Sequence, residues 1–367
     1  MPESRGAGSA ATLGDPSAAQ ERASLRDHTT LRLGGTAGRF VTATTERDLV
    51  EAVRQADRAG EPVLVLGQGS NLVVADDGFP GTVVRVATRG VVPDLDDCDT
   101  LASCGGVGLR VAAGEPWDAL VALAVASGWV GVEALSGIPG LVGATPIQNV
   151  GAYGQEVADT IASVRTWDRH EDCQRTFAWA DCGFGYRTSR FKAEPGRYLV
   201  LEVSFQLKQG TLSSPLRYAE LAAALGVQPL GRVPLGDVRD AVLALRTAKG
   251  MVLDPGDHDT WSAGSFFTNP VLDPASAQRL PDAAPRWPLP DGTVKTSAAW
   301  LIEHAGFGKG HGSGPARLST KHTLALTNRG SARTDDLLGL ARRIRDGVEA
   351  AYGVRLVPEP VLVGCSL

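Results

Sequence analysis

The sequence is poor in the residues on which several classes of protein depend. It has five cysteines, an odd number, and no two of them have the C-x-x-C spacing of a zinc or redox site. A disulfide framework is therefore not expected, and the reducing cytoplasm is the predicted location. The six histidines show neither H-E-x-x-H nor H-x-H spacing, so no metal site is predicted.

An excess of basic residues and long apolar runs are also missing. Lys and Arg number 36 against 41 Asp and Glu, which gives a formal net charge of -5. Nucleic acid and anionic membrane are not expected as partners, because no basic excess is available to neutralise phosphates. No stretch is apolar over the length needed to span a bilayer, and residues 1–20 lack the apolar core of a signal peptide. We expect an intracellular monomer.

The 367 residues predict two or three domains that mix helices and strands. Residues 1–21 are small and polar without periodicity, which predicts a disordered tail. Apolar periodicity and end signals predict helices at 46–60, 115–128, 236–251, 297–305 and 334–352. Strands are predicted at 62–66, 82–86, 161–167 and 198–207. In the last helix, Thr334 is the predicted N-cap and Gly353 follows its end.

Two glycine-rich segments can bring bare backbone close to a ligand. GQGSN at 67–71 follows an apolar strand, and its N–H groups can bind an anion such as a pyrophosphate. GIPGLVGATPIQNVGAYG at 137–154 has almost no charge and can lie against a flat ring system, with Gln148 and Asn149 as polar contacts. The alternatives are a surface turn at 67–71 and a buried structural turn at 137–154.

Three further sites combine charge or a hydroxyl group with apolar neighbours. GFGYRTSRFK at 183–192 places Tyr186 among Arg187, Arg190 and Lys192, and an arginine there can bind a carboxylate or a ring carbonyl. The alternative is a solvated basic loop, which is the usual place of such a cluster. Ser265 in GSFF has no nucleophile elbow, so any catalytic role is that of a proton donor rather than an acylated nucleophile. Glu359 lies between prolines in an apolar strand-like run, either exposed at an edge or placed in a low-dielectric site.

Taken in order, six segments resemble the UDP-N-acetylenolpyruvoylglucosamine reductase family. They are TLRLGGTA (30–37), GQGSNLV (67–73), GIPGLVGATPIQNVGAYG (137–154), YRTSRFK (186–192), GSFFTNP (264–270) and LVPEPVLVG (356–364). The resemblance spans nearly the whole chain after residue 25. LRYAEL around Tyr218 is similar to the type I branch, in which a tyrosine covers the bound nucleotide.

The resemblance implies an α+β fold with an FAD-binding module of the vanillyl-alcohol-oxidase type. Its two α+β subdomains are expected at 22–95 and 96–235, with about 355–367 packing near the first, and an α+β substrate-binding domain at 236–354. The implied activity is the NADPH-dependent reduction of UDP-N-acetylglucosamine enolpyruvate to UDP-N-acetylmuramate through FAD, in peptidoglycan precursor synthesis.

The resemblance also implies site residues in three groups. Arg187, Ser265 and Glu359 match the catalytic residues, with Ser265 as proton donor. The residues matched to FAD are Gly67, Gly69, Ser70 and Asn71 at the pyrophosphate, and Ile147, Gln148, Asn149, Gly154 and Arg187 at the flavin. The residues matched to the UDP-sugar are Tyr186, Tyr218, Arg246, Lys249, Asn269, Lys309 and His322. His322 stands where family members can have glutamine, and Thr268 replaces the lysine expected in GSFFKNP.

Two other functions compete with this interpretation. One is a sugar or hydroxy-acid oxidase on the same FAD-binding scaffold, which would share GQGSN and GIPG but need neither GSFF nor the final glutamate. The other is a nucleotide-sugar binding protein that has lost its flavin. Binding of FAD and reduction of the enolpyruvyl sugar distinguish the three functions.

Overall fold

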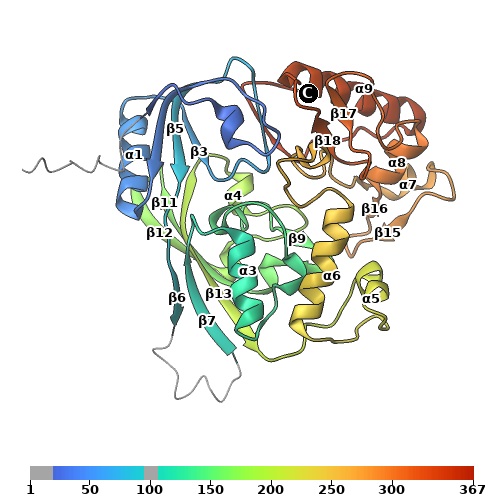
Figure 1. Cartoon of the computed structure of the whole chain (residues 1–367), viewed down its shortest axis with the longest axis horizontal. Helices are drawn as coiled ribbons and strands as arrows, with labels where there is room; N and C mark the ends of the chain where they lie inside the picture. The colour runs from blue at the N-terminus through green and yellow to red at the C-terminus, as the bar shows by residue number, and fades with distance from the viewer. Residues whose placement is uncertain (1–19, 95–105) are drawn as a thin grey trace, which may run out of the picture.

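The computed structural model describes residues 20–94 and 106–367, and its N-terminal part is a four-stranded sheet covered by one helix (Figure 1). The strand order is β1 (Gln20–Glu21), β2 (Ala37–Ala43), β5 (Phe79–Val86), β3 (Val63–Leu66), and the last three strands are parallel. The helix α1 (Glu46–Arg58) buries Leu49, Val53 and Ala56 along one face. The Thr45 hydroxyl caps it by accepting from the Asp48 N–H.

The predicted disordered tail extends two residues too far. Residues 1–19 of that prediction lie outside the described part of the chain, but Gln20 and Glu21 form β1. They pair antiparallel with Phe40 and Arg39 of β2. The ordered fold therefore begins by Gln20, because the edge of β2 supplies backbone hydrogen bonds that a tail lacks.

The second sheet is antiparallel and larger. Its order is β12 (Cys173–Ala178), β11 (Ile161–Asp168), β13 (Tyr198–Gln209), β7 (Gly106–Ala112) and β6 (Val91–Asp94), and β8 (Trp129–Val130) also pairs with β13. The helix α3 (Trp117–Ala126) packs on it through Trp117, whose ring lies 6.1 Å from that of Phe205. One apolar core contains residues from α1, α3 and both sheets, so the two sheets are packed as one unit.

The C-terminal third folds around a second apolar core. It contains α7 (Pro274–Gln278), α8 (Ala298–His304), α9 (Thr334–Tyr352) and three short hairpin-like strand pairings. These strands are β14 (Val271–Leu272), β15 (Arg286–Pro288), β16 (Val294–Thr296), β17 (Ala316–Leu318) and β18 (Leu326–Asn328). Before them, α5 (Ala219–Ala224) and α6 (Leu235–Ala248) pack on each other and α6 also contacts α3.

The C-terminal region returns to the N-terminal part at two places. The strand β19 (Val361–Val363) pairs in parallel with β4 (Leu72–Val74), which directly follows the 67–71 loop. Thr334 begins α9 with Arg333 as its N-cap, so the prediction of Thr334 as the cap is wrong. Its hydroxyl instead donates to the Val74 carbonyl at 2.6 Å, while its N–H donates to Asp76. Gly353, with φ 66°, ends the helix as predicted.

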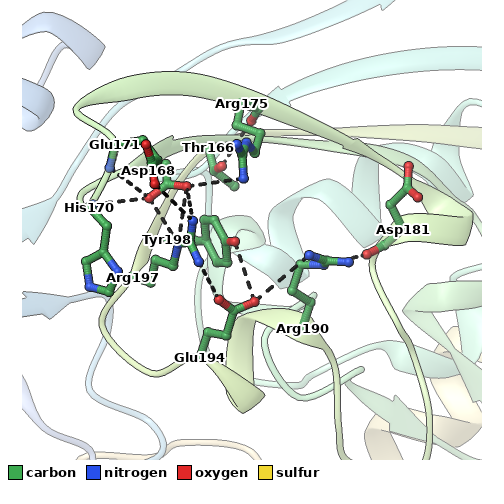
Figure 2. Close-up of polar contacts among 10 residues, drawn as sticks. All are labelled: Thr166, Asp168, His170, Glu171, Arg175, Asp181, Arg190, Glu194, Arg197 and Tyr198. Atoms are coloured by element: carbon green, nitrogen blue, oxygen red, sulfur yellow. Dashed lines mark hydrogen bonds and ion pairs between the residues drawn. The ribbon is translucent and has the colours of Figure 1, made fainter.

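A buried carboxylate joins the strand ends of the second sheet (Figure 2). Asp168 at the end of β11 is fully buried and accepts from Arg197 at 2.9 Å and from the His170 N–H at 3.1 Å. Arg197 also donates to Glu194 at 2.8 Å, and Glu194 directly follows the short helix α4 (Arg190–Ala193). Hydrogen bonding from Arg197 holds the pKa of Asp168 below its usual range. This network connects the sheet to the segment that carries Arg187.

Replacing Asp168 with asparagine should destabilise the protein by about 2 kcal/mol or more, because Arg197 loses its buried counter-charge. Urea unfolding of both proteins at pH 7 measures the loss. Asp346→Asn is a suitable control, since Asp346 pairs with Arg345 on the exposed face of α9. Equal stability of Asp168→Asn and the wild type would contradict the structural role of the network.

Candidate active site

One cavity is lined by segments that lie far apart in the sequence. The segments are 67–72 after β3, 138–152 after α3, 250–265 after α6, and the Glu359 and Val361 positions next to β19. The cavity is also lined by Thr30, Arg187, Lys192 and Arg246. Both predicted glycine-rich segments therefore line one cavity. The three predicted catalytic side chains, Arg187, Ser265 and Glu359, line the same cavity.

The 67–71 loop has the geometry of an anion-binding turn. Gly69 adopts φ 62°, and a Cβ there would collide with the His28 carbonyl oxygen, so glycine is required. In the described part of the chain, no protein acceptor pairs with the backbone N–H groups of Gly69, Ser70 and Asn71. Gln68 and Ser70 fix the loop to its neighbour: Gln68 accepts from the Gly140 N–H at 2.9 Å, and Ser70 donates to the Pro139 carbonyl at 3.2 Å. The loop thus lines the cavity from a fixed position, with three N–H groups that no described acceptor uses.

The 137–154 segment contributes some of its predicted residues to the cavity and not others. Ile147 and Gln148 line it, and Ile147 is 38% exposed as an apolar surface within it. Asn149 is buried with φ 48°, and its amide bonds Glu156 at 2.7 Å and the Gly185 carbonyl at 3.1 Å. Gly154 lies outside the cavity lining, against Arg217. The side chain of Asn149 is thus used within the protein, to hold the two loops together.

Arg187 connects the glycine-rich segment to Glu359. Its guanidinium donates to the Asn149 carbonyl at 3.3 Å and to the Gly151 carbonyl at 2.8 Å. The Nε atom lies 3.3 Å from Glu359 Oε1. Arg187 has a left-handed backbone, φ 52°, and Lys192 Nζ donates to its carbonyl at 3.0 Å. A non-glycine residue in this conformation is strained, and the contacts of its side chain and carbonyl hold it there.

Glu359 is a largely buried carboxylate with polar neighbours. Gln148 Nε2 donates to its Oε1 at 3.3 Å, and Asn71 Nδ2 donates to its carbonyl at 3.4 Å. Burial raises the pKa of Glu359, while Arg187, Lys192 and Gln148 oppose the shift. The Glu359 side chain is 15% exposed, which argues against the edge-exposed position and fits the buried one of the two interpretations that the sequence left open.

Ser265 reaches the same cavity because two extended segments run side by side. The Glu359 N–H donates to the Phe266 carbonyl at 2.8 Å, and the Thr268 N–H donates to the Val357 carbonyl at 3.1 Å. Phe266 and Phe267 are buried, which fixes the segment and leaves the half-buried Ser265 at the cavity wall. Pairing with the P-E-P segment thus places a hydroxyl and a carboxylate in one cavity.

Cationic residues surround the end of α6. Arg246 lines the cavity and donates to the Met251 carbonyl at 2.9 Å, but its buried Nε has no partner among the described residues. Lys249 caps α6 and pairs with Glu220 at 2.7 Å. Burial, with the charges of Lys249 and Lys309, lowers the pKa of His322 to about 4. His322 is therefore neutral at pH 7, and its Nδ1 accepts from the Leu324 N–H at 3.0 Å.

The remaining predicted side chains lie outside the cavity lining. Tyr186 is 39% exposed and has Lys295 Nζ 4.8 Å from its ring centre. Tyr218 is 45% exposed, with its ring edge-on to that of Tyr153 at 5.5 Å. Lys309 is exposed. Aromatic and basic side chains thus lie around the cavity without lining it.

Sequence reasoning missed two residues, Lys192 and Glu220, that the fold brings close to the predicted site residues. Lys192 was part of the basic cluster YRTSRFK but received no role, although it lines the cavity and holds the Arg187 carbonyl. Glu220 carried no sequence signal, because a single glutamate on a short helix is typical of a solvated surface.

Membrane spans and metal sites are absent from residues 20–94 and 106–367. None of their helices combines the length and apolar character needed to cross a bilayer. In the same residues, no three His, Cys, Asp or Glu side chains are grouped to hold a metal ion.

Comparison with known proteins explains this arrangement. Residues 37–176 match the model of an FAD-binding domain, and residues 254–363 match that of the UDP-N-acetylenolpyruvoylglucosamine reductase C-terminal domain. A UDP-N-acetylenolpyruvoylglucosamine reductase of Salinispora arenicola is 59% identical, with 94% of this chain and 95% of the relative covered. The chain belongs to this reductase family. The reductase of Cutibacterium acnes is 58% identical over 92% of this chain and 89% of its own length.

A solved reductase supports the same conclusion. The crystal structure of UDP-N-acetylenolpyruvylglucosamine reductase (MurB) from Thermus caldophilus superposes with a TM-score of 0.64 at 28% identity, covering 94% of this chain and 98% of that one. The predicted α+β fold, with an FAD-binding module followed by a reductase C-terminal domain, is confirmed. The chain is an FAD-dependent oxidoreductase.

The cavity fits FAD in this family member. The free N–H groups of Gly69, Ser70 and Asn71 suit a pyrophosphate, since such donors turned toward a cavity bind anions. The exposed apolar surface of Ile147 suits a ring system. These residues could hold a dinucleotide along the cavity.

Replacing His322 with glutamine should reduce the amount of unfolding free energy that the protein loses at acidic pH. The unfolded chain protonates this histidine below about pH 6.5, whereas the folded chain resists protonation until about pH 4. Stability that depends on the neutral ring therefore decreases as the pH falls between these values. Urea unfolding at pH 7.5 and pH 5 should show the variant gaining about 2 kcal/mol on the wild type.

The exposed His170→Gln is the matched control. An identical pH dependence for His322→Gln and the wild type would mean that His322 titrates normally in the folded protein.

Proposed function

We propose that this reductase converts UDP-N-acetylglucosamine enolpyruvate to UDP-N-acetylmuramate, with Arg187, Ser265 and Glu359 as its catalytic side chains. The observation that supports the proposal best is their convergence on the cavity that the two glycine-rich loops line. Bound FAD, reduced by NADPH, would supply the hydride for the terminal carbon of the enolpyruvyl group.

Arg187 is suited to stabilise the negative charge that the reaction creates. Addition of hydride to the terminal carbon leaves electron density on the adjacent carbon, delocalised into the substrate carboxylate. A guanidinium has five N–H donors, of which Arg187 gives one each to the Asn149 and Gly151 carbonyls, while its Nε faces Glu359 Oε1. The other two remain for a carboxylate, and the fixed position of the group means that little reorganisation is needed as charge develops. Lys192, which also lines the cavity, adds positive charge.

Ser265 would donate the proton that completes the reduction. A serine hydroxyl is a poor acid, so it can protonate only a strongly basic carbon in fixed geometry. The buried Phe266 and Phe267 hold the backbone of Ser265 in place. Glu359 would position Arg187, with Gln148 bonding the same carboxylate oxygen.

The cationic group at α6 would receive the UDP moiety. Arg246 and Lys249 stand three residues apart at the C-terminal end of the helix, and their charges, with that of Lys309, act on His322. A diphosphate carries the complementary charge. The exposed rings of Tyr186 and Tyr218 would contact the nucleotide, and Asn269, which bonds the Ala298 N–H at 3.0 Å, would line its site.

The FAD contacts are also part of the proposal. Gly67, Gly69, Ser70 and Asn71 would bind the pyrophosphate, and Ile147, Gln148 and Arg187 would contact the flavin. Neither Asn149 nor Gly154 lines the cavity. These two residues would therefore contribute to FAD binding through the backbone of their segment. We further propose that the protein uses NADPH, acts as a monomer in the cytoplasm and serves peptidoglycan synthesis, which agrees with its lack of a basic excess and of C-x-x-C pairs.

The direct test is the yellow, FAD-loaded protein mixed with NADPH, with and without the enolpyruvyl UDP-sugar. NADPH oxidation that depends on this sugar supports the reductase. Oxidation with oxygen as the acceptor and no need for the sugar would favour an oxidase. A colourless protein that takes up no FAD would contradict the proposal altogether.

Ser265→Ala should separate the two half-reactions. Reduction of the flavin by NADPH should stay intact, while reoxidation by the sugar substrate should slow by about 10²- to 10⁴-fold, since general acid catalysis contributes on this scale. Stopped-flow absorbance measures both steps. Ser313→Ala, on the loop before β17, is the control, and equal slowing of both steps by Ser265→Ala would refute the proton-donor role.

Glu359→Gln should lower turnover while the protein keeps FAD and its stability. Because the folded-state pKa of Glu359 is raised, its ionised form opposes folding once the pH exceeds the pKa of the unfolded chain. The glutamine variant should therefore melt no lower than the wild type at pH 8. Loss of FAD absorbance from the purified variant would show that Glu359 is structural.

A further inference from the structure

The short helix α5 faces the cationic end of α6 with a single carboxylate. The two helices lie side by side (Figure 1) and share an apolar core that includes Leu221, Ala222, Val238 and Val242. On the outer side of this contact, Glu220 of α5 lies 2.7 Å from Lys249 Nζ. The packing of α5 on α6 therefore brings a negative charge to the residue expected to meet the substrate's diphosphate.

The ion pair belongs to a larger contact between α5 and the site. Lys249 Nζ lies 5.7 Å from the centre of the Tyr153 ring, which in turn meets the Tyr218 ring edge-on at 5.5 Å. Tyr218 is the N-cap of α5. Glu220 and Tyr218 thus approach the site from the same short helix, one through charge and the other through its ring.

The charges nearest to this pair are mainly positive, and Asp118, which pairs with Arg239, also acts on Arg246. Arg246 is one helical turn from Lys249 and has a buried Nε without a partner in the described part of the chain. Lys249, Lys309 and Arg246 all lower the pKa of His322, and the Glu220 carboxylate acts on it in the opposite direction. A group of cations such as this one favours an anion, and the Glu220 carboxylate balances part of its positive charge.

We infer that Glu220 is an internal competitor for the substrate's diphosphate: it neutralises Lys249 in the free enzyme and is displaced when the diphosphate binds. The inference rests on the proposed function and adds to it a residue that lowers substrate affinity. Its physical basis is that the Glu220 carboxylate and the substrate's diphosphate pair with the same cation, Lys249.

The geometry makes this exchange inexpensive. The side chains of Glu220 and Lys249 are 41% and 32% exposed, so water and salt screen their attraction and the pair is weak. A diphosphate carries more charge than one carboxylate and can also contact Arg246, which Glu220 leaves unpaired. The ligand therefore has the stronger interaction with the group of cations, while Glu220 keeps Lys249 paired in its absence.

Calorimetry with UDP and the FAD-loaded enzyme tests the inference. Glu220→Gln should bind UDP about two- to fivefold more tightly than the wild type, because one like charge is removed near the phosphates. The gain should shrink as the salt concentration rises. Glu349→Gln is the matched control, since Glu349 pairs with Arg355 at 2.8 Å on the exposed side of α9, and it should leave UDP affinity unchanged.

A double-mutant cycle with Lys249→Gln assigns the effect to the pair. In the Lys249→Gln background, Glu220→Gln should give little or no gain, because the contested cation is gone. Glu220→Ala should act in the same direction as Glu220→Gln in the wild-type background, and far-UV circular dichroism verifies that α5 and the rest of the fold are retained.

The possible outcomes distinguish a failure of this inference from a failure of the proposed function. UDP affinity that is unchanged or weaker in Glu220→Gln, or a gain that persists without Lys249, overturns the inference alone. A wild-type enzyme that takes up FAD but does not bind UDP overturns the proposed substrate, and the inference with it.

Discussion

The parallel pairing of β19 with β4 is the constraint on which the candidate site depends. It joins the Val361 N–H to the Asn71 carbonyl at 3.0 Å, and so places Glu359 beside the loop that follows β3. Without this pairing, Arg187 would lack its carboxylate partner, and Gln148 would lack the acceptor at 3.3 Å. The P-E-P segment also aligns the Ser265 segment, through the bond between the Glu359 N–H and the Phe266 carbonyl. One short strand contact thus organises the three side chains that we propose as catalytic.

Charge is distributed unevenly along the cavity, and the distribution separates two tasks. Near Glu359, Arg187 and Lys192 lie among apolar and buried groups, where electrostatic interactions are strong and positions are fixed. Around Lys249 the side chains are more exposed and their pairing is weaker. The first environment suits stabilisation of charge that develops during a reaction, and the second suits a ligand that must bind and leave.

Patterns local in sequence predicted much of the fold and part of the site. The amphipathic period of 334–352 located α9 to the residue, and the glycines of 67–71 predicted a turn with free N–H groups, which the structure has. The N-cap of α9 was misplaced by one residue, because the Thr334 hydroxyl bonds Val74, a partner 260 residues away that the local sequence does not reveal. The same limit applies to Asn149, whose amide joins two loops, and to Glu220, whose importance arises from a helix packed against α6. Family resemblance located Arg187, Ser265 and Glu359, but the burial of Glu359 required the fold.

The contact between Asn71 and Glu359 spans 288 residues, and this separation has a consequence for synthesis of the protein. A growing chain exposes its loop for the pyrophosphate early, yet β4 must wait for a partner strand until almost all of the described residues have been made. Folding from the N-terminus can therefore complete the first sheet but not the catalytic cavity. A prematurely terminated product that ends before Glu359 would retain the glycine-rich loops while lacking both the carboxylate of the site and β19. Such fragments could at most bind the flavin, and they would not act as reductases.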